Sequence, residues 1–226
     1  MELSNFTMQV LKNFASVNSN VVINPGNTIM TMAEAKNVLA SATVVEDFPK
    51  KVGIYDLQEF LNVLSLVDSP RVTFEDDHAT IGDSTGRTSI KYYFSDPEML
   101  TTPSKAISMP DPDVSFTLDQ ATLNNLKRAA SALGHSEVSI TYVDSAIRLS
   151  ILDSDNSTSN TYSIDVDGES TLNECNFIFN ISNLKLIPGD YKVDMSTKLI
   201  SKFTNISEEQ DLVYWIALEK SSTFEN

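Results

Sequence analysis

A helix-like segment occurs twice in this chain, and the repeat constrains the fold more than any other feature of the sequence. The first copy is residues 4–17, SNFTMQVLKNFASV, and the second is residues 120–133, QATLNNLKRAASAL. Residues 11–16 match residues 126–131 at four of six positions. Such a repeat in 226 residues predicts a duplicated domain of about 110 residues.

Both copies carry apolar residues at the three- and four-residue steps of an amphipathic helix. These residues are Phe6, Val10, Leu11, Phe14 and Val17 in the first copy and Leu123, Leu126, Ala130 and Leu133 in the second. Asp119 precedes the second copy as a candidate N-cap, and Gly134 follows it as a candidate C-cap. We therefore expect each helix to bury one face.

The opposite faces of the two predicted helices lack acidic residues. Asp and Glu make up 31 of the 226 residues, so about 4 would fall in these 28 positions by proportion, and none does. The polar positions are Asn5, Gln9, Lys12, Asn13, Ser16, Gln120, Asn124, Asn125, Lys127, Arg128 and Ser131. In a chain of net charge -15, this indicates surfaces that lie near something strongly negative. Two ordinary solvated faces that lack acids by chance are the alternative.

The composition is that of a globular protein, with 41% hydrophobic and 21% charged residues. The net charge of -15 excludes binding of nucleic acid over the whole surface, so any such contact needs a local basic face. The single cysteine, Cys175, indicates a reducing compartment and a buried strand thiol. With no apolar leader and no apolar run of about 18 residues, we expect an intracellular protein without a membrane partner.

Strand-like segments and one further helix follow the first copy. We expect a hairpin between segments 21–24 and 28–32, because Asn24, Pro25 and Gly26 form turn-like punctuation between them. A second amphipathic helix is predicted over 56–67, with Asp56 as its cap. The remaining predicted strands of this half are 37–45, 52–55, 71–75, 79–83 and 87–94.

A proline-rich segment, 96–113, separates the predicted domains 1–95 and 114–226. We interpret its apolar residues Met99, Leu100, Ile107 and Met109 as packing on a domain face. The second domain is predicted to contain a short helical turn at 182–187 and strands at 114–118, 137–143, 146–152, 160–166, 177–181, 191–196, 199–203 and 212–219. The fold class is therefore α+β, with two similar domains that each pack two helices on antiparallel β-sheets.

The sequence offers little for catalysis. The two histidines, His78 and His135, have no partner at a spacing suited to a metal or a nucleophile. No glycine-rich phosphate loop is present, and the acidic turn 153–157 lacks the glycine and the final glutamate of a calcium loop. We expect no catalytic residue, no metal and no cofactor.

Short segments along most of the chain resemble the DNA polymerase sliding clamps of T-even-type bacteriophages. The carrying segments are 11–15 (LKNFA), 54–57 (IYDL), 64–67 (LSLV), 177–180 (FIFN), 188–192 (PGDYK) and 217–219 (ALE). The match is poorest over 74–113.

This resemblance implies the DNA-clamp fold, a ring of three subunits around double-stranded DNA, a tethered DNA polymerase and an ATP-driven clamp loader. It also implies no catalytic activity and a place in the cytoplasm of an infected bacterial host, with late-transcription factors as further candidate partners. Because a sliding tether cannot read sequence, its contacts with DNA would be to phosphates.

The resemblance assigns roles to three groups of residues. The candidates for the DNA-facing surface are Lys12, Lys127, Arg128 and Lys185; the predicted helix 56–67 departs from this pattern because it carries Asp56 and Glu59 and no basic residue. For ring closure, segment 87–94 would pair with segment 160–167 of the next subunit. The candidate interface residues are Arg87, Ile90, Lys91, Tyr162, Asp165 and Asp167. A partner pocket is placed at Ile107, Met109, Trp215 and Ala217, although Trp215 is also consistent with a core position.

Two other classes of protein fit parts of the sequence. A non-enzymatic two-domain β-rich structural or interaction protein would share this composition but gives no reason for acid-free helices. An enzyme would need carboxylates from distant strands to converge, and nothing in the spacing indicates that.

Overall fold

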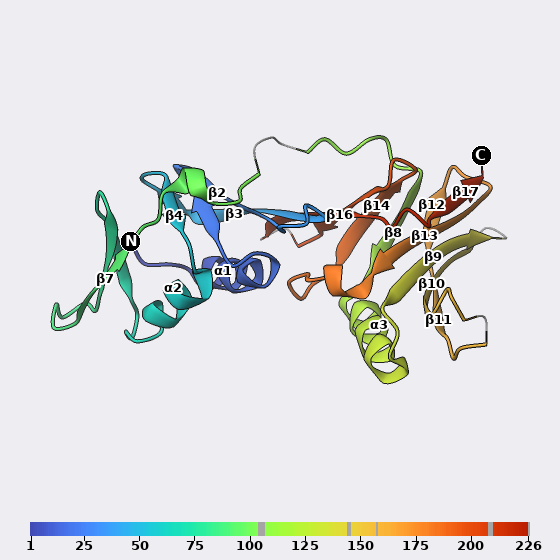
Figure 1. Ribbon diagram of the computed structural model, residues 1–226, viewed down its shortest axis with the longest axis horizontal. Coiled ribbons are helices and arrows are strands. Elements are labelled where there is room, and N and C mark those ends of the chain that lie inside the picture. Colours follow the sequence, from blue (N-terminus) through green and yellow to red (C-terminus); the bar gives the residue numbers. More distant parts are fainter. Residues whose placement is uncertain (104–106, 144–145, 157, 208–209, 226) are drawn as a thin grey trace. The chain divides into compact units, whose positions relative to one another are not determined.

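The computed structural model describes residues 1–103, 107–143, 146–156, 158–207 and 210–225 (Figure 1). The chain divides into two compact units. The first unit comprises Met1–Ala106 and Gln210–Leu212, and the second comprises Ile107–Glu209 and Val213–Asn226. The predicted domain limits of 1–95, 96–113 and 114–226 remain a prediction.

The first unit contains two α-helices, a short 3₁₀ helix and three small groups of strands. In chain order its elements are α1 (Asn5–Val17), β1 (Val21–Ile23), β2 (Gly26–Met32), β3 (Val38–Phe48), β4 (Val52–Ile54), α2 (Leu57–Leu64), β5 (Arg71–Phe74), β6 (His78–Gly82), β7 (Ser89–Tyr93) and η1 (Pro97–Met99).

The strand pairing in the first unit corrects one prediction. The hairpin between 21–24 and 28–32 is wrong, because β1 pairs antiparallel with β4, whereas β2 pairs with β3. All three residues of β1 are buried, so β1 needs cover on both faces. β2 has exposed residues near its start and alternates between buried and half-buried positions only from Ile29 onward. Gly26 at the turn has φ +109°, and the register shifts between Gly26 and Thr28. Strands β5, β6 and β7 form a separate antiparallel sheet in that order.

Helices α1 and α2 pack together in the first unit (Figure 1). Val10, Leu11 and Phe14 of α1 are fully buried, as are Phe60 and Leu64 of α2. Asp56 caps the start of α2, as predicted, because its carboxylate accepts a hydrogen bond from the backbone of Glu59 at 2.9 Å. The predicted helices 4–17 and 56–67 are thus confirmed, the second being shorter at its end.

The segment that follows β7 packs against β4. The backbone N–H of Ser95 donates to the carbonyl of Gly53 at 2.9 Å, and Leu100 is buried. Leu100 therefore behaves as the packing residue that we expected, whereas Met99 is 84% exposed and Ile107 is 37% exposed. Residues 104–106 of the predicted connector lie outside the described residues.

The second unit contains one α-helix and two antiparallel sheets. Its elements are β8 (Val114–Leu118), α3 (Gln120–Leu133), β9 (Glu137–Val143), β10 (Ala146–Leu152), β11 (Tyr162–Val166), β12 (Gly168–Ser170), β13 (Glu174–Asn180), η2 (Ile181–Asn183), β14 (Tyr191–Ser196), β15 (Ile200–Asn205), β16 (Asp211–Ala217) and β17 (Thr223–Glu225).

The two sheets of the second unit have the strand orders β11-β10-β9-β13-β17 and β12-β8-β14-β15-β16. Helix α3 packs on β10 and β11 (Figure 1). Asp119 caps its start and Gly134, with φ +73°, ends it, so both predicted caps are confirmed. Cys175 is a buried strand thiol, also as predicted, and burial raises its pKa to about 11. Strands β12 and β17 were not predicted.

The helical turn predicted at 182–187 is a 3₁₀ helix of three residues, η2. The Asn180 side chain caps η2 by accepting from the backbone of Ser182 at 3.0 Å. Pro188 disfavours helical backbone at Ile187, the residue before it, so the last position of the predicted turn is unfavourable for a helix. Among the described residues, the second unit therefore has one α-helix and one 3₁₀ helix where two helices were expected.

Candidate nucleic-acid interface and contact surfaces

Carboxylates hold the starts of both repeated helices, although the N-cap of α1 is Ser4, whose side chain accepts from the backbone of Thr7. Neither α1 nor α3 has an acidic residue in its first turn. At the start of α1, the buried Glu46 of β3 accepts hydrogen bonds from the backbone of Ser4 and the hydroxyl of Thr7. Burial alone would raise the pKa of Glu46, but these hydrogen bonds outweigh it and the pKa lies below its ordinary value.

Helix α3 has a corresponding arrangement built from different residues. The Asp119 side chain accepts from the backbone of Thr122 at 2.6 Å, and the Asp190 side chain accepts from the backbone of Gln120 at 2.8 Å. A helix N-terminus favours negative charge. In both units, this charge is supplied from the helix end or from a neighbouring segment, so the polar face of the helix stays free of acids.

The structure places the four predicted DNA-facing residues unequally. Lys12 is exposed on α1, and Arg128 is exposed on α3, where it donates to the Asn125 side chain. Lys127 is half-buried on α3, and burial lowers its pKa. Lys185 is exposed just after η2.

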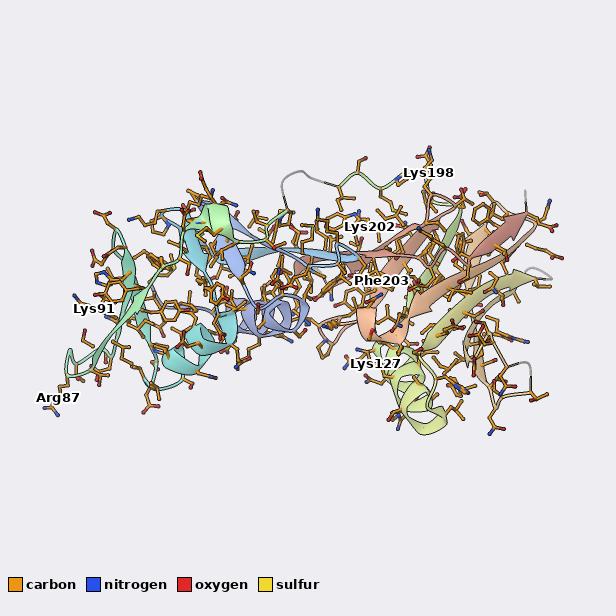
Figure 2. All side chains as sticks on the ribbon, viewed as in Figure 1. Arg87, Lys91, Lys127, Lys198, Lys202 and Phe203 are labelled. Carbon is orange, nitrogen blue, oxygen red and sulfur yellow. The ribbon has the colours of Figure 1, made fainter. Side chains whose placement is uncertain are left out.

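Lys127 and Lys185 both line one hollow of about 430 Å³ between α3 and η2. Figure 2 labels Lys127 on α3. The residues that line it are Lys127, Ala130, Ser131, His135, Ile181, Ser182, Leu184 and Lys185. Sequence reasoning did not assign Ser182 or His135 to this surface. The missing information was the spacing between α3 and the segment after β13, which are far apart in the sequence.

The predicted subunit-interface residues lie on or beside two edge strands. β7 is the outer strand of its sheet and β11 is the outer strand of another. Ile90 and Lys91 lie in β7, whereas Arg87 precedes it as an exposed residue, so the strand is shorter than the predicted 87–94. Ile90 is half-buried and Lys91 is exposed.

On the other edge, Tyr162 and Asp165 lie in β11 and Asp167 follows it. Asp165 already binds Arg148 within the chain, through two hydrogen bonds of 2.7 and 3.0 Å. The hydrogen bonding with Arg148 and the charge of its guanidinium hold the pKa of Asp165 below its ordinary value. A hollow of about 800 Å³ lies beside this edge and is lined in part by Asp119, Asp165 and Asp167.

The four residues of the predicted partner pocket belong to the second unit. Trp215 and Ala217 are half-buried on β16, on the face opposite the buried Tyr214. Trp215 lies opposite Lys202 of β15, and its indole nitrogen Nε1 is buried without a hydrogen-bond partner in the described part of the chain. Met109 is half-buried. The grouping of Ile107 and Met109 with these two strand residues remains a prediction.

The described residues contain no group of three or more His, Cys, Asp or Glu side chains placed to hold a metal ion. His78 forms a pair with the adjacent Asp77 at 2.7 Å, and His135 donates from Nε2 to the Asn160 carbonyl at 3.0 Å. No helix within the described ranges is long and apolar enough to cross a membrane.

Two family models match the chain in succession. The model described as DNA polymerase processivity factor matches residues 4–109, and the model described as gp45 sliding clamp, C terminal, matches residues 115–220. Three curated sliding clamps align over almost the whole chain. The clamp of Vibrio phage KVP40 is 32% identical over 97% of this chain and 99% of its own length. Those of Escherichia phage RB69 and Enterobacteria phage T4 are 31% and 32% identical, each over 99% of both chains.

Solved structures of more distant proteins share the fold. The A. fulgidus PCNA, solved with the C-terminal region of FEN-1 bound, superimposes with a TM-score of 0.71 at 12% identity, over 98% of both chains. The PCNA of Entamoeba histolytica gives a TM-score of 0.69 at 15% identity, over 94% of both chains. These similarities confirm the α+β fold with two similar domains.

Proposed function

The chain belongs to the sliding-clamp family of DNA polymerase processivity factors, and from that premise we propose that it closes into a homotrimeric ring around double-stranded DNA. In this proposal the ring tethers the replicative DNA polymerase, and an ATP-driven clamp loader opens and closes it. The phage origin of the relatives supports a role in the cytoplasm of an infected bacterial host, where late-transcription factors are further candidate partners.

The observation that carries the ring proposal is a pair of matched edge strands. β7 in the first unit and β11 in the second are each five residues long, and each pairs with a single neighbour among the described strands. An unpaired edge exposes backbone donors and acceptors that can bind another strand. If β7 of one copy adds to β11 of the next, the contact is head-to-tail, and such contacts form a ring when the rotation between subunits closes.

Charge supports the same pairing. Arg87 and Lys91 lie at the β7 edge, and Asp167 lies at the β11 edge beside the hollow of about 800 Å³. Because Asp165 is occupied by Arg148, Asp167 is the better placed carboxylate for a neighbour's cation. Ile90 and Tyr162, both half-buried, would supply apolar contact across the strands.

Passage of DNA is supported by the acid-free faces of α1 and α3. Lys12, Lys127, Arg128 and Lys185 would contact phosphates, so binding would be weak, independent of sequence and sensitive to salt. Retention comes from the closed ring, because DNA leaves only when the ring opens or when an end passes through.

Partner binding is proposed at Ile107, Met109, Trp215 and Ala217. The A. fulgidus PCNA, a protein with this fold, binds the C-terminal region of FEN-1. Trp215 and Ala217, both half-buried on one face of β16, would supply the apolar contact for such a ligand. Replacing Ile107 with Ala should reduce stimulation of the polymerase, and unchanged stimulation would show that the pocket lies elsewhere.

We propose that the chain has no catalytic activity of its own, as its clamp relatives suggest. The rival function, a two-domain β-rich structural or interaction protein, predicts no ring.

The deciding experiment is the solution mass by size exclusion with light scattering over a dilution series. We expect a species of three times the chain mass of 25.0 kDa. Reversing the charges of Arg87 and Lys91 should shift this species toward monomer, while the same change at Lys50, which binds Asp76 within the first unit, should leave it intact. A monomer at all concentrations would reject the ring and favour the rival function.

A further inference from the structure

The two units differ in what lies beside the repeated helix. In the first unit, the eight-residue helix α2 packs against α1. In the second unit, the corresponding position after β13 holds only the three-residue η2. The shorter element leaves the hollow of about 430 Å³ next to α3, which we call the α3–η2 hollow.

The α3–η2 hollow is cationic. Lys127 and Lys185 line it, and no carboxylate is among its described lining residues. Lys127 lies between the buried Leu123 and Ala130, one helical turn away on each side, which explains why it is half-buried. Lys127 has no hydrogen bond or ion pair with any described residue. A partly desolvated ammonium without an acceptor is costly, so this position favours an anion.

The remaining lining suits a ligand that is both anionic and partly apolar. Ala130 and Leu184 are buried and form an apolar floor, while Ser131 and Ser182 are exposed. The Ser182 hydroxyl donates to the Asn180 side chain at 2.6 Å. His135 is held at one end because its Nε2 donates to the Asn160 carbonyl. A phosphodiester presents charged oxygens beside the apolar C–H groups of two sugars, which matches a cationic rim over an apolar floor.

We propose that the α3–η2 hollow seats one phosphodiester of the encircled duplex, so that the second unit holds the DNA backbone more strongly than the first. The inference rests on the proposed ring function and adds an asymmetry to it. DNA is the favoured occupant because the hollow is continuous with the acid-free face of α3, where Arg128 is also exposed. An acidic peptide from a partner protein is the competing occupant.

The first test compares equivalent lysines of the two repeats. A fluorescent duplex of random sequence is titrated with the intact ring over a series of salt concentrations. Lys127→Gln should weaken binding several-fold and reduce the magnitude of the salt slope by about 1 for each subunit whose Lys127 contacts a phosphate, so by up to about 3 for the ring. Lys12→Gln, at the equivalent position of α1, should change both quantities less. Equal effects of the two substitutions would overturn the proposal.

The second test fills the hollow without changing charge. Ser131→Met adds apolar volume at the rim of the α3–η2 hollow, and Ser16→Met makes the same change at the equivalent position of α1. We expect weaker duplex binding for Ser131→Met alone. Melting temperature and trimer mass are recorded for all four variants, so that a folding or assembly defect is recognised.

The outcomes separate this proposal from the ring function. If the wild-type ring binds and retains DNA but Ser131→Met and Ser16→Met bind it equally well, the hollow is not a phosphate seat. If Ser131→Met keeps duplex binding and loses stimulation of the polymerase, the occupant is a peptide and the proposal is wrong. If the wild-type protein forms no ring and binds no duplex, the proposed function itself fails.

Discussion

The first unit packs the repeated helix against a second α-helix, whereas the second unit leaves it beside a 3₁₀ helix of three residues. The two copies consequently bury different faces. Thr7 and Leu11 of α1 and their equivalents Thr122 and Leu126 of α3 are buried in both. Beyond this shared core, the buried positions diverge.

Helix α1 also buries Val10 and Phe14, whereas α3 buries Leu123 and Ala130. The buried face of α3 is therefore rotated about the helix axis relative to that of α1. In α3 it lies next to Lys127, whereas in α1 it lies farther from the equivalent Lys12. A lysine kept in both repeats is thus exposed in one and half-buried in the other. Duplication preserved the residue while the neighbouring element changed its environment.

The comparison is tested most strongly by Phe14→Ala, which gives α1 the residue that α3 has at the equivalent position, Ala129. Phe14 is fully buried, so we expect a loss of about 3–5 kcal/mol in the free energy of unfolding, measured by urea denaturation. Leu11→Ala and Leu126→Ala, at a shared buried position, should have similar effects on their own units. A loss below about 1 kcal/mol for Phe14→Ala would show that α1 does not depend on this face.

The second test concerns the carboxylates that cap the two helices. Glu46→Gln replaces a buried charge acceptor at the start of α1, and we expect a loss of about 1.5–3 kcal/mol. Asp190→Asn, at the start of α3, changes an exposed residue and should cost about 0.5–1 kcal/mol. Equal losses would mean that the two caps are equivalent despite their different burial.

The Glu46 effect should also depend on pH. Its pKa in the folded state lies below the ordinary value of 4.5, so the unfolded chain binds the proton more tightly. The stabilisation is therefore complete above the ordinary pKa and is lost as the pH falls through the folded-state pKa. The stability difference between wild type and Glu46→Gln should narrow over that acidic range, and a constant difference would contradict the assignment.

The third test concerns the backbone of Ile187, in the segment after η2, which is held by hydrogen bonds with two tyrosine side chains. Tyr191 donates from its hydroxyl to the Ile187 carbonyl at 2.6 Å, and the Ile187 N–H donates to the Tyr214 hydroxyl at 3.1 Å. Burial raises the pKa of Tyr191 to about 12. Tyr191→Phe leaves a buried carbonyl without its donor and should cost about 1–2 kcal/mol in thermal or urea unfolding.

The matched control lies in the first unit. Tyr92 donates from its hydroxyl to the Asp56 carbonyl at 3.1 Å in an exposed setting, where water can replace it. Tyr92→Phe should cost less than about 0.5 kcal/mol. If the two substitutions cost the same, the tyrosines of the second unit do not anchor the segment that carries Lys185.

Local patterns predicted the features that depend on neighbours in sequence. The repeated helices and the caps Asp56, Asp119 and Gly134 follow from periodicity and capping preferences, and the structure confirms them. The pairing of β1 with β4 could not be predicted in this way, because the partners are far apart in the sequence and the turn at Gly26 suggested a hairpin.

The candidate site shows the same division. Lys127 was identified because it belongs to an acid-free helix, and its position between Leu123 and Ala130 was a readable sign of partial burial. The hollow beside Lys127 exists because η2 has only three residues, and the hydrophobic periodicity of the sequence does not predict that length. Glu46 lies on the same face of β3 as the buried Val44 and Phe48, but its hydrogen bonds with Ser4 and Thr7 join segments far apart in the sequence and could not be predicted from local pattern.

The smallest expected effect concerns how the two helices end. Helix α1 ends at Asn18 in extended backbone, whereas α3 ends at Gly134 with φ +73°. Gly134→Ala meets no neighbouring atom but must adopt the left-handed conformation, so we expect a loss of about 1 kcal/mol in thermal unfolding. Gly134→Asn should recover part of it, because Asn tolerates this conformation better.

The same end also positions one residue of the α3–η2 hollow. The backbone N–H groups of Gly134 and His135 both donate to the Ala130 carbonyl, at 2.9 and 3.1 Å, and His135 then lies at the hollow. Gly134→Ala should therefore weaken duplex binding slightly as well as stability, while Gly134→Asn restores both together. Recovery of stability without recovery of duplex binding would mean that His135 is placed independently of the helix end, and that the left-handed glycine serves only the fold of the second unit.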